Sequence, residues 1–264
     1  MSMMLRALWN YRGFILGSVK REFQLKYRNS MLGAAWTVLN PLAMILVYTV
    51  IFSRVMRARL PGVNNAFAYS IYLCAGVLTW GLFAEITGRS KNVFLEHANL
   101  LKKISFPRIC LPFIVVGSAW LNFAIIFGLF TIFLVVSGNF PGWTYFSLFP
   151  VLILQTAFSI GLGMVLGVLN VFFRDVGQLF DVVLQFWFWL TPIVYSTSIL
   201  PERVQSLMDL NPMARLAVAY QMILLSDKTP DWIFLWPVAL LSTLLCIWGF
   251  RLFRLHAGEM VDEI

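Results

Sequence analysis

The sequence predicts an all-α membrane protein with six transmembrane helices, an N-terminal amphipathic helix at the interface and a re-entrant hairpin between the fifth and sixth spans. The first observation is the composition, because 60% of the 264 residues are hydrophobic and only 12% are charged. Soluble domains usually contain about 45–50% apolar and about 25% charged residues. The other two observations are long runs without charge and basic residues gathered between those runs. A water-soluble enzyme is therefore excluded.

Charge-free runs set the number of spans. They cover residues 29–53, 60–84, 109–173, 182–201 and 232–250. A bilayer core of about 30 Å needs roughly 20 helical residues, so the run 109–173 must cross twice. Its break is a turn rich in Gly and Pro at 138–142. Within one transmembrane domain, 1–264, the predicted spans are 32–53, 66–88, 109–137, 143–172, 179–198 and 232–250.

The basic residues predict the orientation of the chain. An even number of spans places both termini on one side, and most of the 20 basic residues then share that side, in segments 1–30, 89–108 and 251–264. The positive-inside rule makes this side cytoplasmic. The net charge of +8 is thus assigned to topology and not to a nucleic-acid partner. A short cluster, Arg54, Arg57 and Arg59, opposes the bias.

Residues 13–30 have the pattern of a basic amphipathic helix that lies in the headgroup plane. Apolar side chains recur every four residues: Ile15, Val19, Phe23 and Tyr27. The basic residues of the segment lie off that stripe: Lys20, Arg21, Lys26 and Arg28. The alternative is a basic tail that only fixes the orientation of the chain.

The segment 89–108 is longer than a simple turn between two spans requires. An apolar set that shares one face of a short helix is flanked by charges: Val93, Phe94, Ala98 and Leu101. An exposed amphipathic helix favours docking into a groove on a partner protein. A helix that rests on the membrane is the alternative.

Residues 199–231 are too apolar for a plain loop. The stretch Leu216–Ser226 has no charge and is too short to span, so it is typical of a re-entrant or interfacial helix. Irregular backbone at membrane depth is tolerated only where protein or a wet cavity shields it. We therefore expect this hairpin to cover a pathway exit, with a peripheral membrane-resting hairpin as the alternative.

The sequence predicts neither a catalytic nor a metal site. It contains no Gly-rich phosphate loop ending in Lys-Ser/Thr and no His-Glu-x-x-His pair. The three cysteines are far apart and lie in apolar sequence, without metal-ligand or disulfide spacing. These observations disfavour a membrane-bound enzyme.

Ion-driven transport is also disfavoured. Ionisable residues that couple ions to transport usually lie at mid-membrane, but here the candidates fall near helix ends: Glu85, Arg174, Asp175 and Asp181. Arg174 and Asp175 are expected to pair at the cytoplasmic mouth between the fourth and fifth spans. The energy for transport must then come from outside the chain.

Aromatic residues are concentrated in the first and fifth spans. Aromatic faces stack on the C–H faces of sugar rings, so the rings are candidates for the lining of a glycan pathway: Trp36, Tyr48, Phe52, Phe186, Trp187, Trp189 and Tyr195. Interfacial belts and lipid-facing rings are the alternative. Gly163 and Gly167 in the fourth span permit close helix packing.

Four separated patches carry a resemblance to a known family. They are 26–42, 99–112 and 172–177, together with the pairs Thr191–Pro192 and Asn211–Pro212. With these patches in order along the whole chain, the sequence resembles the permease subunit of polysaccharide-exporting ATP-binding-cassette (ABC) transporters, which handle O-antigen, capsule and teichoic-acid chains.

The resemblance implies a multi-pass protein of the bacterial inner membrane, with both termini cytoplasmic, that forms a homodimer bound to two separate ATPase subunits. ATP and Mg²⁺ are bound by the ATPase, and this chain binds no cofactor. The substrate is a lipid (undecaprenyl)-linked polysaccharide, and membrane lipids surround the complex. A dimer also fits the size of the pathway, since twelve helices can enclose a sugar chain that six barely could, and a two-fold pair is the simplest closed assembly.

The resemblance also implies site residues. ATPase coupling is assigned to the segment around 96–103: Phe94, Glu96, Asn99, Leu100, Leu101, Lys102 and Lys103. The cytoplasmic interface comprises Lys20, Arg21, Lys26, Arg28, Arg174 and Asp175. The first and fifth spans flank a lateral gate, and the hairpin with Asn211 and Pro212 forms the outer gate. A drug or antibiotic exporter permease of the same superfamily, or a glycan or lipid-phosphate enzyme, is the alternative function.

Overall fold

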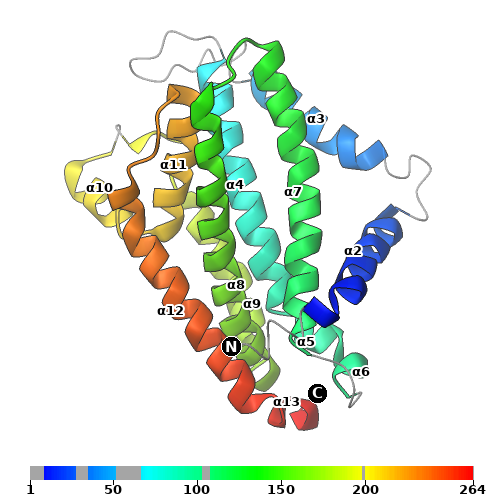
Figure 1. The fold of residues 1–264 in the computed structure, drawn as a ribbon. Helices are drawn as coiled ribbons and strands as arrows, with labels where there is room; N and C mark the ends of the chain where they lie inside the picture. Colours follow the sequence, from blue (N-terminus) through cyan, green and yellow to red (C-terminus); the bar gives the residue numbers. More distant parts are fainter. Residues whose placement is uncertain (1–8, 28–34, 52–66, 103–107, 198–199, 264) are drawn as a thin grey trace.

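The computed structural model describes residues 9–27, 35–51, 67–102, 108–197 and 200–263, and within these ranges its regular structure is entirely helical. The described part contains four helical segments that are long and apolar enough to cross a membrane. They are α4 (Ala68–Ser90), α7 (Cys110–Val136), the segment Trp143–Phe172 and α12 (Trp232–His256). These segments stand side by side as a bundle (Figure 1). The all-α membrane fold is therefore confirmed, and the count of six spans stays a prediction.

The boundaries of the long helices differ little from those predicted. The predicted span 66–88 is α4, and 109–137 is α7. The predicted span 143–172 begins with a 3₁₀ turn, η3 (Trp143–Ser147), before α8 (Leu148–Phe172). Helix α12 continues to His256, so the predicted tail 251–264 starts inside a helix and then forms α13 (Glu259–Glu263).

The centre of the bundle is formed by α4 and α8. In each of them, 67% of the apolar window is buried, against 28% for α7 and 22% for α12. Gly163 and Gly167 of α8 explain the close approach, because a Cβ at Gly163 would lie 2.5 Å from Ser90 Cβ and one at Gly167 would lie 2.7 Å from Ser90 O. The predicted close-packing role of Gly163 and Gly167 is confirmed.

Two predicted spans differ from the described helices in different ways. Helix α3 (Trp36–Tyr48) corresponds to 32–53, and its helical course reaches residue 51, where the described range stops. Helix α9 (Asp175–Trp189) corresponds to 179–198, but it starts four residues earlier and ends nine residues sooner. The early end has a local cause, because Pro192 lacks an N–H group and disfavours helical geometry at the residue before it.

Helix α2 (Arg12–Tyr27) is the predicted N-terminal helix, and it packs against α7. Ile15 and Val19 are half-buried in the apolar cluster of α7, and a Cβ at Gly117 would lie 3.0 Å from Val19 Cγ2. The apolar stripe is thus partly used to hold α2 on the bundle. Its position in the headgroup plane stays a prediction.

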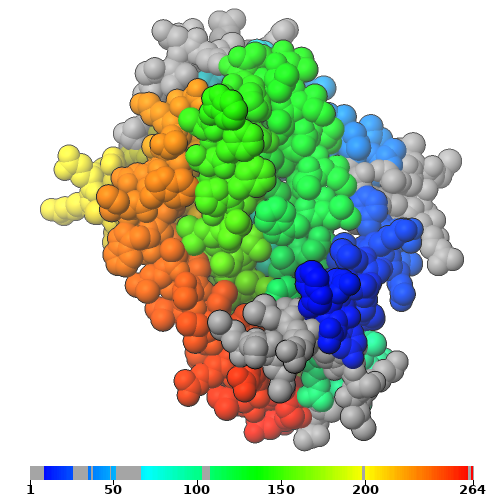
Figure 2. Space-filling view, in the orientation of Figure 1, coloured from blue at the N-terminus to red at the C-terminus, as the bar shows by residue number. Residues whose placement is uncertain are grey.

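After α9 the chain rises in two steps. The end of the bundle that carries α5 and α6 lies at the bottom of Figure 1 and is called the lower end. From there the chain runs through α9 to α10 (Glu202–Met208). Helix α11 (Pro212–Ser226) then continues to the upper end, and the chain turns back down before α12 begins near the start of α11, where Arg215 donates to Phe234 O at 2.5 Å. Figure 2 shows α10 in yellow at the side of the molecule.

The hairpin region 199–231 is divided between an exposed and a buried helix. Helix α11 buries Leu216, Tyr220 and Ile223 against the bundle, chiefly against α4. Helix α10 has no buried residue. The apolar stretch predicted for a peripheral or re-entrant helix therefore packs inside the bundle.

Candidate functional site

The lower end of α4 continues directly into the segment predicted to dock on a partner. Lys91 caps α4, and its side chain is only 5% exposed. Its Nζ donates a hydrogen bond of 2.8 Å to Gly177 O and forms an ion pair with Asp181, whose side chain is 60% exposed. Both partners belong to α9. The buried ammonium group of Lys91 is thus neutralised by the Asp181 carboxylate, which remains exposed at the surface of the chain.

Asn170, near the end of α8, completes this arrangement. Its Nδ2 donates to Lys91 O at 2.9 Å and to Asn92 Oδ1 at 3.1 Å, and its Oδ1 accepts from Gly177 N at 2.8 Å. A Cβ at position 177 would lie 2.7 Å from Asn170 Oδ1, so the close approach requires glycine. We call Lys91, Asn92, Asn170, Gly177 and Asp181 the lower clasp. It joins α4, α8 and α9.

The predicted coupling helix consists of two short helices, α5 (Val93–Glu96) and α6 (Ala98–Leu101). Phe94 and Leu101 are buried, and the Phe94 ring stacks on Phe253 of α12 with centroids 5.4 Å apart. The sequence predicted that the apolar face of this segment is exposed for docking. That prediction is wrong, because Phe94 and Leu101 point into the bundle. These side chains fill the chain's own core because the lower ends of α7, α8 and α12 offer them an apolar surface.

The outward side of the same segment is polar. Glu96, Asn99 and Lys102 are exposed, and Leu100 is partly buried against the apolar cluster. Lys103 lies outside the described residues. The surface that this segment offers to a partner thus consists of Glu96, Asn99 and Lys102. The coupling role of the predicted residues stays a prediction.

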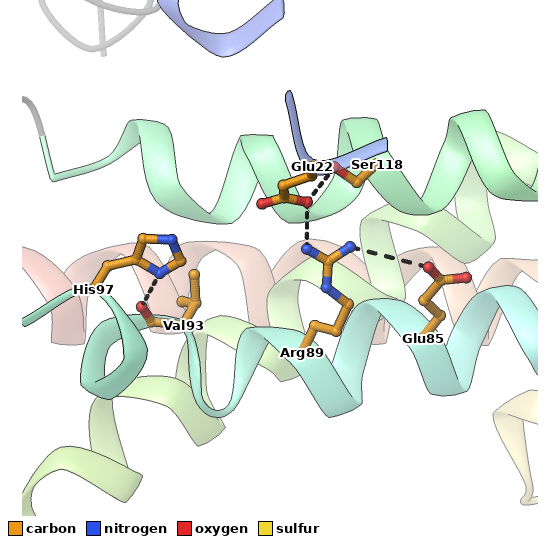
Figure 3. A network of polar contacts seen from close by, with 6 residues as sticks. All are labelled: Glu22, Glu85, Arg89, Val93, His97 and Ser118. Carbon is orange, nitrogen blue, oxygen red and sulfur yellow. Dashed lines mark hydrogen bonds and ion pairs between the residues drawn. The ribbon is translucent and has the colours of Figure 1, made fainter. Parts of the chain in front are cut away.

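A second charged network lies on the opposite side of α4 (Figure 3). Arg89 Nη2 lies 2.6 Å from Glu22 Oε2, and Arg89 Nη1 lies 4.0 Å from Glu85 Oε1. Ser118 donates to Glu22 at 2.6 Å, and Asn122 donates to Glu85 at 2.8 Å. The network fastens α2 to α4 and α7. A cavity of about 370 Å³ adjoins it between these helices.

The predicted cytoplasmic-interface residues are not brought together into one cluster. Lys20 and Arg21 are exposed on α2, and Arg174 and Asp175 are exposed where α8 meets α9. Among the described residues no ion pair joins Arg174 to Asp175, so the expected pairing is wrong. Asp175 instead occupies the first turn of α9, where a carboxylate interacts favourably with the helix dipole. Arg28 and the side chain of Lys26 lie outside the described parts.

The aromatic residues of α9 divide into an inward and an outward set. Trp187 packs edge-on against Phe83, with ring centroids 5.2 Å apart, and its Nε1 donates to Asn211 Oδ1 at 2.8 Å. Phe186 and Trp189 are exposed. Trp187 therefore packs into the bundle, and the pathway role of the outward pair stays a prediction. Trp36 of α3 is also exposed, whereas Phe52 and the Tyr48 side chain lie outside the described parts.

Asn211 connects the end of α9 to the start of α11. Its Oδ1 accepts from Met213 N at 3.0 Å as the N-cap of α11, and its Nδ2 donates to Leu190 O at 3.1 Å. Pro212 occupies the first helical turn, where its missing N–H costs nothing. The Asn–Pro pair predicted for the outer gate thus fixes the corner between two helices.

Residues 192–195 are held by neutral side chains of α4 and α11. Tyr72 Oη lies 2.7 Å from Tyr195 O and 3.0 Å from Pro192 O, so its single proton is shared between two carbonyls. Gln221 donates to Pro192 O at 3.0 Å. With Asn211 and Trp187 these residues are called the upper clamp: Tyr72, Trp187, Pro192, Tyr195, Asn211 and Gln221. Tyr195, predicted in the pathway, contributes its backbone carbonyl and donates its own hydroxyl to Trp189 O.

Sequence reasoning did not single out several of these residues. Glu22, Asn170 and Tyr72 were not predicted to have a role, and Lys91 entered only as a topology charge. Asn170 is one of four side-chain amides in the apolar run 109–173, with Asn122, Asn139 and Gln155, and a buried amide must find hydrogen-bond partners. That polar group within an apolar helix was the one available signal, although the sequence could not name its partners.

Comparisons with known proteins show which family the sequence matches. A family model described as ABC-2 type transporter matches residues 15–225. The chain is 34% identical over 264 residues to the O-antigen export system permease protein RfbA of Myxococcus xanthus, covering 99% of each chain. A protein of the same name from Klebsiella pneumoniae is 30% identical over 202 residues, or 76% of each chain. The polysialic acid transport protein KpsM of Escherichia coli is 19% identical over 92% of this chain and 93% of its own.

Proposed function

The chain belongs to the ABC-2 type transporter family, and from this premise we propose that it is the membrane permease of an ATP-driven polysaccharide exporter. The substrate is a lipid-linked glycan of the O-antigen or capsule type, moved across the inner membrane. The observation that carries this proposal is the 34% identity to an O-antigen export permease, which extends over 99% of both chains. A match along the full length covers the spans, the loops and the ends together.

We infer that the lower end faces the cytoplasm. Basic residues gather there, as the positive-inside rule requires: Arg89, Lys91, Lys102, Arg108, Arg174, Arg251 and Arg254. In this orientation α3, α4, α7 and α8 cross in turn, α9 and α11 together make the fifth crossing, and α12 makes the sixth. Helix α9 is short, but it runs from the lower end towards α11, and this course supports its assignment to the fifth span.

The energy is proposed to come from an ATPase subunit bound at the lower end. Glu96, Asn99 and Lys102 are exposed there and offer hydrogen-bonding and charged groups to a partner. Their own helices pack through buried apolar side chains on α7, α8 and α12, so force applied to this surface reaches the bundle. ATP and Mg²⁺ belong to the partner.

A homodimer supplies the pathway in this proposal. Large apolar side chains are exposed on α3 and on α9, including Leu42, Leu46, Val182 and Phe186. Contiguous apolar faces of this kind suit lipid or a second copy of the chain. A two-fold pair with α3 and α9 beside the axis encloses a path wide enough for a sugar chain.

Deletion of the gene tests the proposal. Surface glycan is expected to disappear while lipid-linked glycan accumulates inside the cell, and a plasmid copy is expected to restore the surface glycan. The measurement is immunoblotting of glycan from intact and from permeabilised cells. Normal surface glycan in the deletion strain would refute the proposal, and loss of drug resistance instead would favour a drug exporter.

A further inference from the structure

Helix α9 is fixed to the bundle by directional polar contacts at its two ends. The lower clasp holds Gly177 and Asp181, and the upper clamp holds Trp187 and the carbonyl of Leu190. Between these ends α9 touches the bundle through apolar side chains such as Leu184. Apolar contacts are non-directional, so they tolerate a change in tilt better than the contacts at either end.

The lower clasp is also the point where the coupling segment begins. Lys91 and Asn92 directly precede α5, and the hydrogen bonds of Asn170 hold the backbone of Lys91 and the side chain of Asn92. A displacement of α5 and α6 therefore pulls on Lys91, whose side chain is bound to α9, and on Asn92, whose side chain is bound to Asn170 of α8. The coupling segment and α9 are separated by about 80 residues in sequence. In space they are joined through the ion pair between Lys91 and Asp181.

The burial of the ammonium group makes this connection stiff. Lys91 is almost fully buried, and its Nζ has Gly177 O and Asp181 as partners. A buried charge that loses its partner is costly, so Lys91 follows Asp181 when either helix moves. Asp181 is 60% exposed, but its removal leaves the buried ammonium group without a carboxylate, so both charges must also be removed together in a test.

We propose that Lys91 and Asp181 are positioning residues that transmit movement of the segment 93–102 to α9, so that α9 changes its tilt when the ATPase moves that segment. This inference rests on the proposed function. The ion pair transmits the movement, and Asn170 fixes the position of the coupling segment relative to α9. The upper clamp is the fulcrum, the fixed point about which α9 tilts. The neighbouring pair Arg89–Glu22 holds α2 and lies outside this link.

The test uses the permease–ATPase complex reconstituted in vesicles, with lipid-linked glycan as cargo. The variants are Asp181→Asn, which keeps the shape of the side chain, and Lys91→Met with Asp181→Asn, which removes both charges and leaves no buried charge unpaired. Glycan exported per ATP hydrolysed is measured together with the thermal stability of the complex. Asp181→Glu is the conservative variant, and Lys228→Met is the matched removal of an exposed charge in the loop before α12.

Both clasp variants are expected to hydrolyse ATP while exporting about tenfold less glycan per ATP, taking the order of magnitude by which the loss of one hydrogen bond to a charged group changes an equilibrium. Asp181→Glu and Lys228→Met are expected to match the wild type. Export per ATP equal to the wild type in both clasp variants overturns the inference. A parallel fall of export, hydrolysis and thermal stability also overturns it, since that is the result of a merely structural ion pair.

Failure of the proposed function gives a different result. A wild-type complex that hydrolyses ATP and moves no glycan refutes the function itself. Failure of the inference alone leaves wild-type export intact and the variants unchanged or merely unstable.

Discussion

The two ends of α9 are held by different chemistry. At the lower end a buried ammonium group at the end of α4 meets an exposed carboxylate of α9. At the upper end a phenol, an indole and two amides bind one another or backbone carbonyls, and every group is neutral. The difference teaches how each end holds α9: at the lower end separation of the charge pair is costly because the ammonium group is buried, whereas at the upper end neutral groups on backbone carbonyls define one geometry.

The largest expected effect tests whether the lower end is a core or a docking face. Leu101→Asp places a carboxylate in a fully buried apolar site, which costs several kcal/mol because the charge has no partner there. We expect loss of folded protein, measured as yield of monodisperse protein in detergent. The neighbouring Lys102→Asp changes an exposed residue and is expected to fold normally. Normal yield of Leu101→Asp would show that this side chain faces a partner after all.

The next effect concerns the corner of the upper clamp. Asn211→Ala removes the N-cap of α11, worth about 0.5–2 kcal/mol, and leaves the Trp187 indole N–H without its partner, worth about 1–3 kcal/mol more. A lower unfolding temperature is expected in thermal scans. Gln178→Ala, an exposed position on α9, serves as the control. An unchanged unfolding temperature for Asn211→Ala would contradict the fulcrum role of this corner.

A smaller effect is expected for the phenol of the same clamp. Tyr72→Phe deletes one hydroxyl that is shared between two carbonyls and keeps the ring, so a loss of about 1 kcal/mol is expected. Because no charge is involved, this loss should be the same at low and at high salt. A loss of stability that disappears in high salt would contradict the distinction between a charged lower end and a neutral upper end of α9.

The smallest effect belongs to the charged network beside α2. Arg89→Gln breaks a partly exposed ion pair with Glu22, and such pairs contribute only about 0–1 kcal/mol. The difference from wild type should shrink further as salt increases, because salt screens exposed charges. Thermal scans at two salt concentrations measure it. A large loss of stability that does not depend on salt would show that this network behaves like the neutral upper clamp and not like an exposed ion pair.

The correspondence between sequence and structure depends on the kind of residue. Helices α4, α7, α8 and α12 were predicted within a few residues, apart from the longer end of α12, because apolar runs between charges must match the bilayer. The close packing at Gly163 and Gly167 also followed from their spacing. The side to which Phe94 and Leu101 point was predicted wrongly, since an amphipathic segment can bury its apolar face in a partner or in its own chain.

The sequence by itself determined that this chain is a helical membrane protein, where its long helices lie and which family it resembles. Those properties follow from hydropathy and short motifs, which are local along the chain. Only the tertiary structure decided that Lys91 meets Asp181, that Arg89 meets Glu22 and that Asn211 joins α9 to α11. In a chain this apolar, both lipid-facing and protein-facing surfaces are hydrophobic, so helical periodicity does not tell them apart. The partners of its few polar groups emerge only when the helices pack.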